Sequence, residues 1–333
     1  MVVPMSQPLR QSAARKAPTF VQTPPSESRD PANVLREALQ RPRVSIPPRF
    51  LYDDLGSQLF TVITALEEYY PTRTEAAIVR EHLPALAAAV PVAGCTLVDL
   101  GAGDCKKAAA LFPTVQPSHY VAVDVSAEFL RGALGALQRR FPAIEMCGVG
   151  TDFSRRLTLP NEVPGGRRLF FYPGSSIGNF ARGEAVQFLQ SVREQMHGDG
   201  VLWIGVDLQK PVDVLLRAYD DALGVTAAFD KNVLRHTNRL AGTDFDPRQW
   251  RHVARYDEAE HRIEMHLEAT DDVTVTWPGG ERRFASGERI LTEYSHKYSI
   301  DGFTALLAEA GLRVAGHWTD PKGWFGVFVA VPS

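Results

Sequence analysis

Residues 96–107, Thr-Leu-Val-Asp-Leu-Gly-Ala-Gly-Asp-Cys-Lys-Lys, constrain the fold of this 333-residue chain more than any other stretch. A short apolar run turns through Gly101 and Gly103 and enters an alanine-rich pattern, which predicts a strand, a tight loop and a helix. Glycine permits a sharp turn and leaves no Cβ between the backbone and a ligand at the strand end. The stretch therefore predicts a nucleotide-binding turn in an α/β fold.

An acid beyond this turn narrows the choice of ligand. Asp124 closes the next predicted strand, 120–124, at the distance of about 20 residues where a carboxylate accepts from ribose hydroxyls. A dinucleotide fingerprint needs a third glycine where this chain has Lys106. The pattern favours S-adenosylmethionine over a nicotinamide dinucleotide, and an ordinary strand-helix turn remains the structural alternative.

Strand and helix patterns alternate along the rest of this region, which predicts a parallel sheet covered by helices. The expected strands are 96–100, 120–124, 144–148, 168–172 and 201–207. Two further β-rich stretches, 313–318 and 325–331, follow an insertion. This order predicts a seven-stranded, Rossmann-like class I methyltransferase sheet, with loops at Gly101, Asp124, Asp152-Phe153 and 173–179 facing one crevice.

Changes in composition predict the domain boundaries. Residues 1–32 are rich in Pro, Ser, Gln and Arg and lack periodicity, so we expect a disordered tail. Helices are expected at 33–39, 57–66 and 73–89. Residues 210–298 change character and contain a Pro-Gly-Gly hairpin turn at 278–280. We expect a methyltransferase domain of residues 33–209 and 299–333, interrupted by an inserted α+β substrate-binding domain.

Charge and cysteine content exclude several functions. The net charge is −3 without a basic block, so we expect no nucleic-acid partner. Cys95, Cys105 and Cys147 have no CxxC spacing, which favours a reducing compartment over disulfides or zinc. His261 and His266 are expected on opposite faces of a strand, so we expect no metal. Without an apolar span or signal peptide, we expect a cytoplasmic protein away from membranes. No apolar helix is left over once the core is assigned, so we expect a monomer.

Several longer stretches occur in one order and carry a family resemblance. They are Phe-Leu-Tyr-Asp-Asp-Leu-Gly-Ser-Gln-Leu-Phe at 50–60, Glu-Tyr-Tyr-Pro-Thr-Arg-Thr-Glu at 68–75, Gly-Ser-Ser-Ile-Gly-Asn at 174–179, Arg-Ala-Tyr-Asp-Asp at 217–221, Gly-Val-Thr-Ala-Ala-Phe at 224–229, Arg-Ile-Glu-Met at 262–265 and Leu-Thr-Glu-Tyr-Ser-His-Lys at 291–297. Together they resemble the S-adenosylmethionine-dependent histidine Nα-methyltransferases of the ergothioneine pathway. These enzymes make trimethylhistidine, or hercynine.

The resemblance implies a role for each matching residue. The cofactor would be held by Gly101, Lys107, Asp124, Asp152 and Phe153. The carboxylate and amine of histidine would be bound by Tyr69, Asn179 and Tyr219, and its imidazole by Glu293 and Ser295, beside Met265. We expect Tyr52 and Asn179 to assist proton loss. The loop Asp104-Cys-Lys-Lys107 departs from the family pattern, which carries Ser or Thr and then an acid before its Lys.

Structural interpretations stand beside these functional ones. The aromatics in 50–70 equally suit helix packing, and Asp152 and Phe153 suit a loop acid beside a core ring. Glu293 suits a strand-end carboxylate paired with Lys297 or an Arg. A second function to be weighed keeps S-adenosylmethionine but methylates tryptophan or a modified histidine, which a buried Glu293 and a bulky Met265 disfavour. A nicotinamide-dependent oxidoreductase and a non-catalytic binding protein are two further classes of function.

Overall fold

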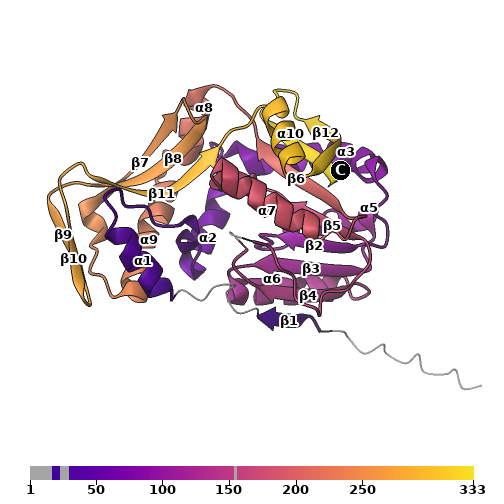
Figure 1. Cartoon of the computed structure of the whole chain (residues 1–333), viewed down its shortest axis with the longest axis horizontal. Helices are drawn as coiled ribbons and strands as arrows, with labels where there is room; N and C mark the ends of the chain where they lie inside the picture. Colours follow the sequence, from indigo (N-terminus) through magenta and orange to yellow (C-terminus); the bar gives the residue numbers. More distant parts are fainter. Residues whose placement is uncertain (1–16, 23–29, 154–155) are drawn as a thin grey trace, which may run out of the picture.

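The computed structural model describes residues 17–22, 30–153 and 156–333 (Figure 1). Most of the predicted tail lies outside these residues, but the expectation of disorder is wrong for Thr19–Gln22, which form strand β1. This strand pairs in parallel with β4, Glu145–Gly150. Its Phe20 ring occupies the space above Gly148, where a Cβ would lie 2.3 Å from a ring carbon. A glycine in the neighbouring strand thus makes room for a short edge strand.

The main sheet has eight strands in the order β1-β4-β3-β2-β5-β6-β13-β12, one more than expected because β1 joins the edge. The remaining strands are β2 Thr96–Leu100, β3 His119–Asp124, β5 Arg168–Tyr172, β6 Val201–Asp207, β12 Leu312–Thr319 and β13 Phe325–Pro332. Strand β13 runs antiparallel to β6 and β12, and the other pairs are parallel. Every residue of β2, β5 and β6 is buried, as expected for a sheet covered on both faces.

Helices cover both faces of this sheet (Figure 1). On one face, α7 Arg182–Glu194 and α10 Ile300–Glu309 pack in one apolar cluster. On the other face, α3 Tyr70–Ala89, α5 Phe112–Val115 and α6 Ala127–Arg140 share a second cluster. The short helix α4 Lys106–Ala109 follows the glycine turn directly. The prediction of a large parallel sheet between helices is confirmed.

A second lobe lies beside the sheet (Figure 1). It contains α8 Val212–Tyr219, α9 Val225–Ala241, the antiparallel sheet β11-β8-β7 and the hairpin β9-β10. The strands are β7 Trp250–Asp257, β8 Arg262–Ala269, β9 Val273–Trp277, β10 Gly280–Phe284 and β11 Arg289–His296. The hairpin predicted at Pro278-Gly-Gly280 is confirmed.

Two of the three expected N-terminal helices pack on this second lobe, whereas α3 covers the main sheet as expected. Helices α1 Pro31–Leu39 and α2 Asp54–Ile63, with the 3-10 turn η1 Pro48–Leu51, contact α9 and share its apolar cluster. Asp53 caps α2 by accepting from Gly56 N at 2.8 Å, and it also accepts from Asn232 Nδ2 at 2.6 Å. The Asp53 carboxylate therefore caps the N-terminus of α2 and also joins α2 to α9.

The two lobes meet where β11 contacts the 3-10 turn η2, Ser176–Asn179. A Cβ on Gly178 would lie 2.9 Å from the carbonyl oxygen of His296, so glycine permits this close approach. His296 Nδ1 also lies 2.9 Å from the carbonyl oxygen of Gly178. The loop that follows β5 is thereby brought against the strand that carries Glu293 and Ser295.

Candidate active site

The turn after β2 is open above its glycines and faces a fixed carboxylate. Gly101 and Gly103 have φ values of +72° and +51°, and a Cβ on either would meet no atom within 4 Å. Asp124, at the end of β3, accepts from Gly103 N at 2.9 Å and from Ser126 N at 2.8 Å. Burial raises the pKa of Asp124, while these backbone donors lower it. An acceptor beside an open turn fits the ribose of an adenosine.

Lys107 lies one turn further on and is held by an acid that sequence reasoning missed. Its Nζ lies 2.7 Å from Glu75 Oε2, and Glu75 Oε1 accepts from Gly174 N at 2.8 Å. Glu75 is buried on the same face of α3 as Ile78 and Val79. An acid on the apolar face of a helix is therefore the sequence feature that could have indicated Glu75. The Glu75 carboxylate joins the turn after β2 to the turn after β5.

The loop after β4 has a different environment from the one expected. Asp152 forms an ion pair with Arg49 Nη1 at 3.4 Å, which connects this loop to η1 of the second lobe. The Phe153 ring packs against Tyr172 and Phe188, with centroid distances of 6.3 and 5.9 Å. Phe153 is half-buried at the edge of the core. Phe153 thus packs on the core while it stays partly exposed.

An aromatic chain lines the second lobe. Tyr52 contacts Phe60 and Phe229 edge to face at 5.5 and 5.4 Å, Phe60 contacts Tyr69 at 6.1 Å, and Tyr69 contacts Tyr219 at 6.4 Å. Burial raises the pKa of each of the three tyrosines well above its ordinary value. Their hydroxyls are therefore neutral donors or acceptors rather than phenolate bases.

Ser126 connects this aromatic chain to the glycine turn. Its hydroxyl donates to the carbonyl oxygen of Tyr52 at 2.9 Å, while its backbone N–H donates to Asp124. The Tyr52 loop is thus fixed directly beside the carboxylate at the end of β3. The structure therefore places the expected catalytic residue Tyr52 next to the expected cofactor residue Asp124.

Asn179 and Glu293 form the junction between the lobes. Asn179 Nδ2 donates to Glu293 Oε2 at 3.2 Å, and Glu293 lies opposite Met265 in the pairing of β11 with β8. An irregularity between Leu291 and Glu293 shifts the register there. Burial, with a smaller contribution from Asp230, raises the pKa of Glu293 to about 8. The Glu293 side chain therefore favours the neutral carboxylic acid at neutral pH.

Ser295 and Tyr219 share a buried lysine. Tyr219 Oη lies 2.8 Å from Ser295 Oγ, and Lys297 Nζ lies 3.0 Å from the first oxygen and 2.8 Å from the second. Lys297 Nζ also lies 2.9 Å from Asp207 Oδ2. Lys297 makes these three contacts instead of the ion pair with Glu293 that the structural alternative offered, although Lys297 still lowers the pKa of Glu293.

Asp207 is a second acid that sequence reasoning missed. It closes the fully buried β6 as Asp124 closes β3, so the same signal was present. Its carboxylate accepts from Tyr70 Oη at 2.7 Å and contacts Lys210. Its backbone N–H donates to Ser175 Oγ at 2.8 Å, in the loop that carries Asn179. Lys297 and Lys210 lower the pKa of Asp207 despite its burial, so it stays ionised.

A further buried pair supports Tyr219 from its backbone. His252 Nε2 lies 2.8 Å from the carbonyl oxygen of Tyr219, and its Nδ1 lies 2.6 Å from Asp230 Oδ2. Burial opposes the charged imidazole, but the contact with Asp230 outweighs it and raises the pKa of His252. Tyr219 is therefore held at its hydroxyl by Lys297 and at its carbonyl by His252.

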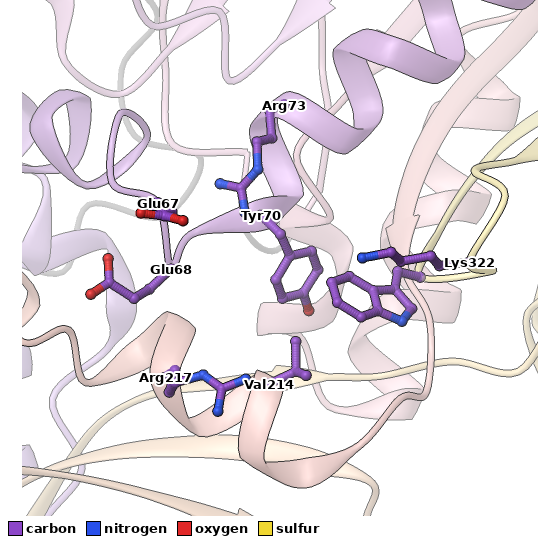
Figure 2. Close-up of a pocket in the computed structure, with 8 residues that line it drawn as sticks. Glu67, Glu68, Tyr70, Arg73, Val214, Arg217 and Lys322 are labelled. Atoms are coloured by element: carbon purple, nitrogen blue, oxygen red, sulfur yellow. The ribbon is translucent and has the colours of Figure 1, made fainter.

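A cavity of about 340 Å³ lies elsewhere between the lobes (Figure 2). It is lined by Glu67, Glu68, Tyr70, Arg73, Val214, Arg217, Lys322 and Trp324. None of the predicted site residues lines it. Among residues 17–22, 30–153 and 156–333, no group of His, Cys, Asp and Glu side chains is placed to hold a metal ion. In the same residues each helix is too short or too polar to cross a membrane.

An open glycine turn beside a fixed carboxylate, in a sheet closed by an antiparallel strand, is typical of the S-adenosylmethionine-dependent methyltransferases, and this chain is one of that class. The sequence model described as "Histidine-specific methyltransferase, SAM-dependent" matches residues 31–332. The chain therefore belongs to the family of histidine-specific methyltransferases.

Curated relatives agree with this family. The chain is similar to the histidine N-alpha-methyltransferase of Mycolicibacterium smegmatis, with 42% identity over 89% of this chain and 93% of the relative. The histidine N-alpha-methyltransferase of Mycobacterium tuberculosis is 41% identical over 88% of this chain and 92% of its own length. Ergothioneine biosynthesis protein 1 of Neurospora crassa is 32% identical over 82% of this chain and 32% of its own length.

Proposed function

We propose that this protein transfers three methyl groups from S-adenosylmethionine to the α-amino group of L-histidine and so makes hercynine, the first step of ergothioneine biosynthesis. The observation that carries the proposal is the buried Glu293 beside Ser295, at the junction with Asn179. An imidazole has one N–H and one acceptor nitrogen, which an acid and a hydroxyl bind together. The two curated relatives with over 40% identity bear the name of this activity.

Five residues would hold the cofactor. The open turn at Gly101 would receive the adenosine, and Asp124 would accept from the ribose hydroxyls. Lys107 would face the amino-acid part of the cofactor, with Glu75 fixing its ammonium group. Asp152 would accept from the adenine amine once its ion pair with Arg49 is broken. The partly exposed Phe153 would contact the base.

The substrate roles follow from the polarity of each side chain. Tyr69 is a neutral donor suited to a carboxylate. Tyr219 donates its proton to Ser295, so Tyr219 and Asn179 suit the α-amine through their oxygens. Glu293 and Ser295 would bind the imidazole, and Met265 would pack against the ring from β8. A histidine analogue without a ring N–H would leave a buried acid unpaired, which explains how such a pocket selects its substrate.

The reaction needs alignment more than acid–base strength. The bound S-adenosylmethionine supplies an electrophilic methyl group. Asn179 and the tyrosines would orient the amine lone pair toward that group at about 3 Å and exclude water. Because burial raises the pKa of Tyr52, its hydroxyl stays neutral, and it would relay a proton only by accepting one while it donates its own. The amine proton would leave directly to water or through Tyr52 and Asn179, without a dedicated strong base.

The lobes would divide this work. We propose that residues 210–298 form an inserted substrate-binding domain, completed by the N-terminal helices that pack on α9. We also propose that one chain is sufficient for activity in the cytoplasm. Size-exclusion chromatography with light scattering tests the monomer, and activity that appears only in a larger species would contradict it.

Competition tests the proposed acceptor. The enzyme is incubated with S-adenosylmethionine and an equal mixture of the standard amino acids, and products are detected by mass spectrometry. We expect a gain of three methyl groups on histidine alone. Methylation of tryptophan instead would retain the methyltransferase class and refute the imidazole roles of Glu293 and Ser295.

A further inference from the structure

The buried ammonium group of Lys297 has three protons and three acceptors. Its Nζ lies 2.9 Å from Asp207 Oδ2, 3.0 Å from Tyr219 Oη and 2.8 Å from Ser295 Oγ. The side chains of Lys297 and Asp207 are 0% and 1% exposed. A lysine ammonium group donates and never accepts, so both hydroxyl oxygens must accept one of its protons.

The number of protons in this cluster determines whether the hydroxyl pair of Tyr219 and Ser295 donates to a ligand. Tyr219 and Ser295 carry one hydroxyl proton each, and one of these protons lies in the 2.8 Å bond between them. The other proton has no place inside the cluster because Lys297 fills the remaining side. One hydroxyl proton is therefore left to donate to a ligand, whichever of the two residues provides it.

We propose that Lys297 is a specificity-determining positioning residue: it forces the Ser295 and Tyr219 hydroxyls to act as a donor, so that the pocket requires an acceptor nitrogen in the ring of its substrate. This inference rests on the proposed function, in which the ring lies between Glu293 and Ser295. Glu293 then accepts the ring N–H, and the hydroxyl pair donates to the other nitrogen. The pocket selects a neutral imidazole by both of its nitrogens.

Lys210 offers a matched control. It contacts the same Asp207 carboxylate, and its side chain is equally buried. Its other contacts are with Tyr70 Oη at 2.8 Å and with the carbonyl oxygen of Leu208 at 2.5 Å. Lys210 therefore shares the electrostatic role of Lys297 but does not donate to the hydroxyl pair. Substitution of either lysine by methionine removes one buried ammonium group beside Asp207.

The test compares ligands that differ in one ring atom. Histidine, 3-(pyrrol-2-yl)alanine and 3-(pyrrol-3-yl)alanine are titrated by calorimetry into the enzyme with S-adenosylhomocysteine. Each pyrrole keeps one ring N–H and carries C–H in place of the acceptor nitrogen. In the wild type the better pyrrole should bind roughly 10- to 100-fold more weakly than histidine, because a buried donor loses its partner. Lys210→Met should retain that ratio.

Lys297→Met should weaken histidine binding and reduce the ratio to less than about 3-fold. A water in the vacated space both donates and accepts, so the hydroxyls are free to reverse their direction. A ratio that persists in Lys297→Met would overturn the proposal, as would an equal loss in Lys210→Met. Lys297→Gln, whose amide also donates and accepts, repeats the test if the methionine variant does not fold.

The wild-type titrations separate this proposal from the proposed function. If histidine is neither bound nor methylated, the proposed function fails. If histidine is methylated but the better pyrrole binds equally well, the polarity argument alone is refuted.

Discussion

Glu293→Gln should make the unliganded protein more stable relative to wild type, by an amount that grows as the pH rises. The same substitution should impair histidine binding. Burial raises the pKa of Glu293 from 4.5 to about 8. The folded protein therefore holds a proton that the unfolded chain has released between these values. Stability is lost across this window as pH rises, at about 1.4 kcal/mol per pH unit. Between pH 5 and pH 8 the ionisation of this carboxyl group therefore lowers the free energy of unfolding by about 3–4 kcal/mol.

Glutamine keeps an oxygen that accepts from Asn179 but has no proton to lose. We therefore expect the stability of Glu293→Gln relative to wild type to be about 3–4 kcal/mol more favourable at pH 8 than at pH 5. Urea unfolding at both pH values measures this difference, and all other titrating groups cancel in the comparison. A relative stability that is the same at both pH values would refute the buried, neutral Glu293.

Binding supplies the second half of this prediction. A neutral amide is a weaker acceptor than a carboxylate, so histidine should bind roughly 10- to 100-fold more weakly to Glu293→Gln. Wild-type binding at pH 7 should also release a proton from Glu293. Calorimetry in two buffers of different ionisation enthalpy detects that proton, and a buffer-independent enthalpy would contradict it.

Three other expectations concern residues around the site. Tyr52→Phe should lower kcat at least about 10-fold if the hydroxyl passes on the amine proton, with the melting temperature unchanged because the ring contacts remain; a wild-type rate would exclude Tyr52. Glu75→Gln should destabilise the protein by about 1.5–3 kcal/mol, since Lys107 loses a charged partner, and urea unfolding measures this, with an unchanged midpoint as the contrary result. The contact with Asp230 raises the pKa of His252. The contribution of this pair to the free energy of unfolding is therefore complete below about pH 6.5 and declines as the pH rises through the folded-state pKa of His252. Asp230→Asn should abolish that pH dependence of stability, and a stability profile identical to wild type would contradict this role of the pair.

The central part of the fold could be predicted from sequence because its signals are local. The buried strand and glycine turn at 96–107 and the apolar strands around it predicted β2 to β6 to within a few residues. The acid that closes β3 was found in the same way. Asp207 closes β6 with an equal signal, but no nucleotide fingerprint points to that position, so the sequence alone does not single it out.

Other features depend on contacts between distant residues. Strand β1 can pair with β4 because Gly148 leaves space for the Phe20 ring, and the two residues are far apart in the sequence. Helix α2 is joined to α9 by the hydrogen bond between Asp53 and Asn232, which no periodicity reveals. Glu75 gains its role only when α3 places it against Lys107 and Gly174. Local patterns predict elements, whereas the partners of buried charges are fixed by tertiary structure.

The central claim is trimethylation of one nitrogen. It is tested most directly by incubating the enzyme with ¹³C-methyl-labelled S-adenosylmethionine and α-¹⁵N-labelled L-histidine, and by locating the methyl groups with NMR. We predict three equivalent methyl groups, each coupled to the α-nitrogen, in the final product. Methyl groups on the imidazole, or a product that stops at one methyl group, would contradict it.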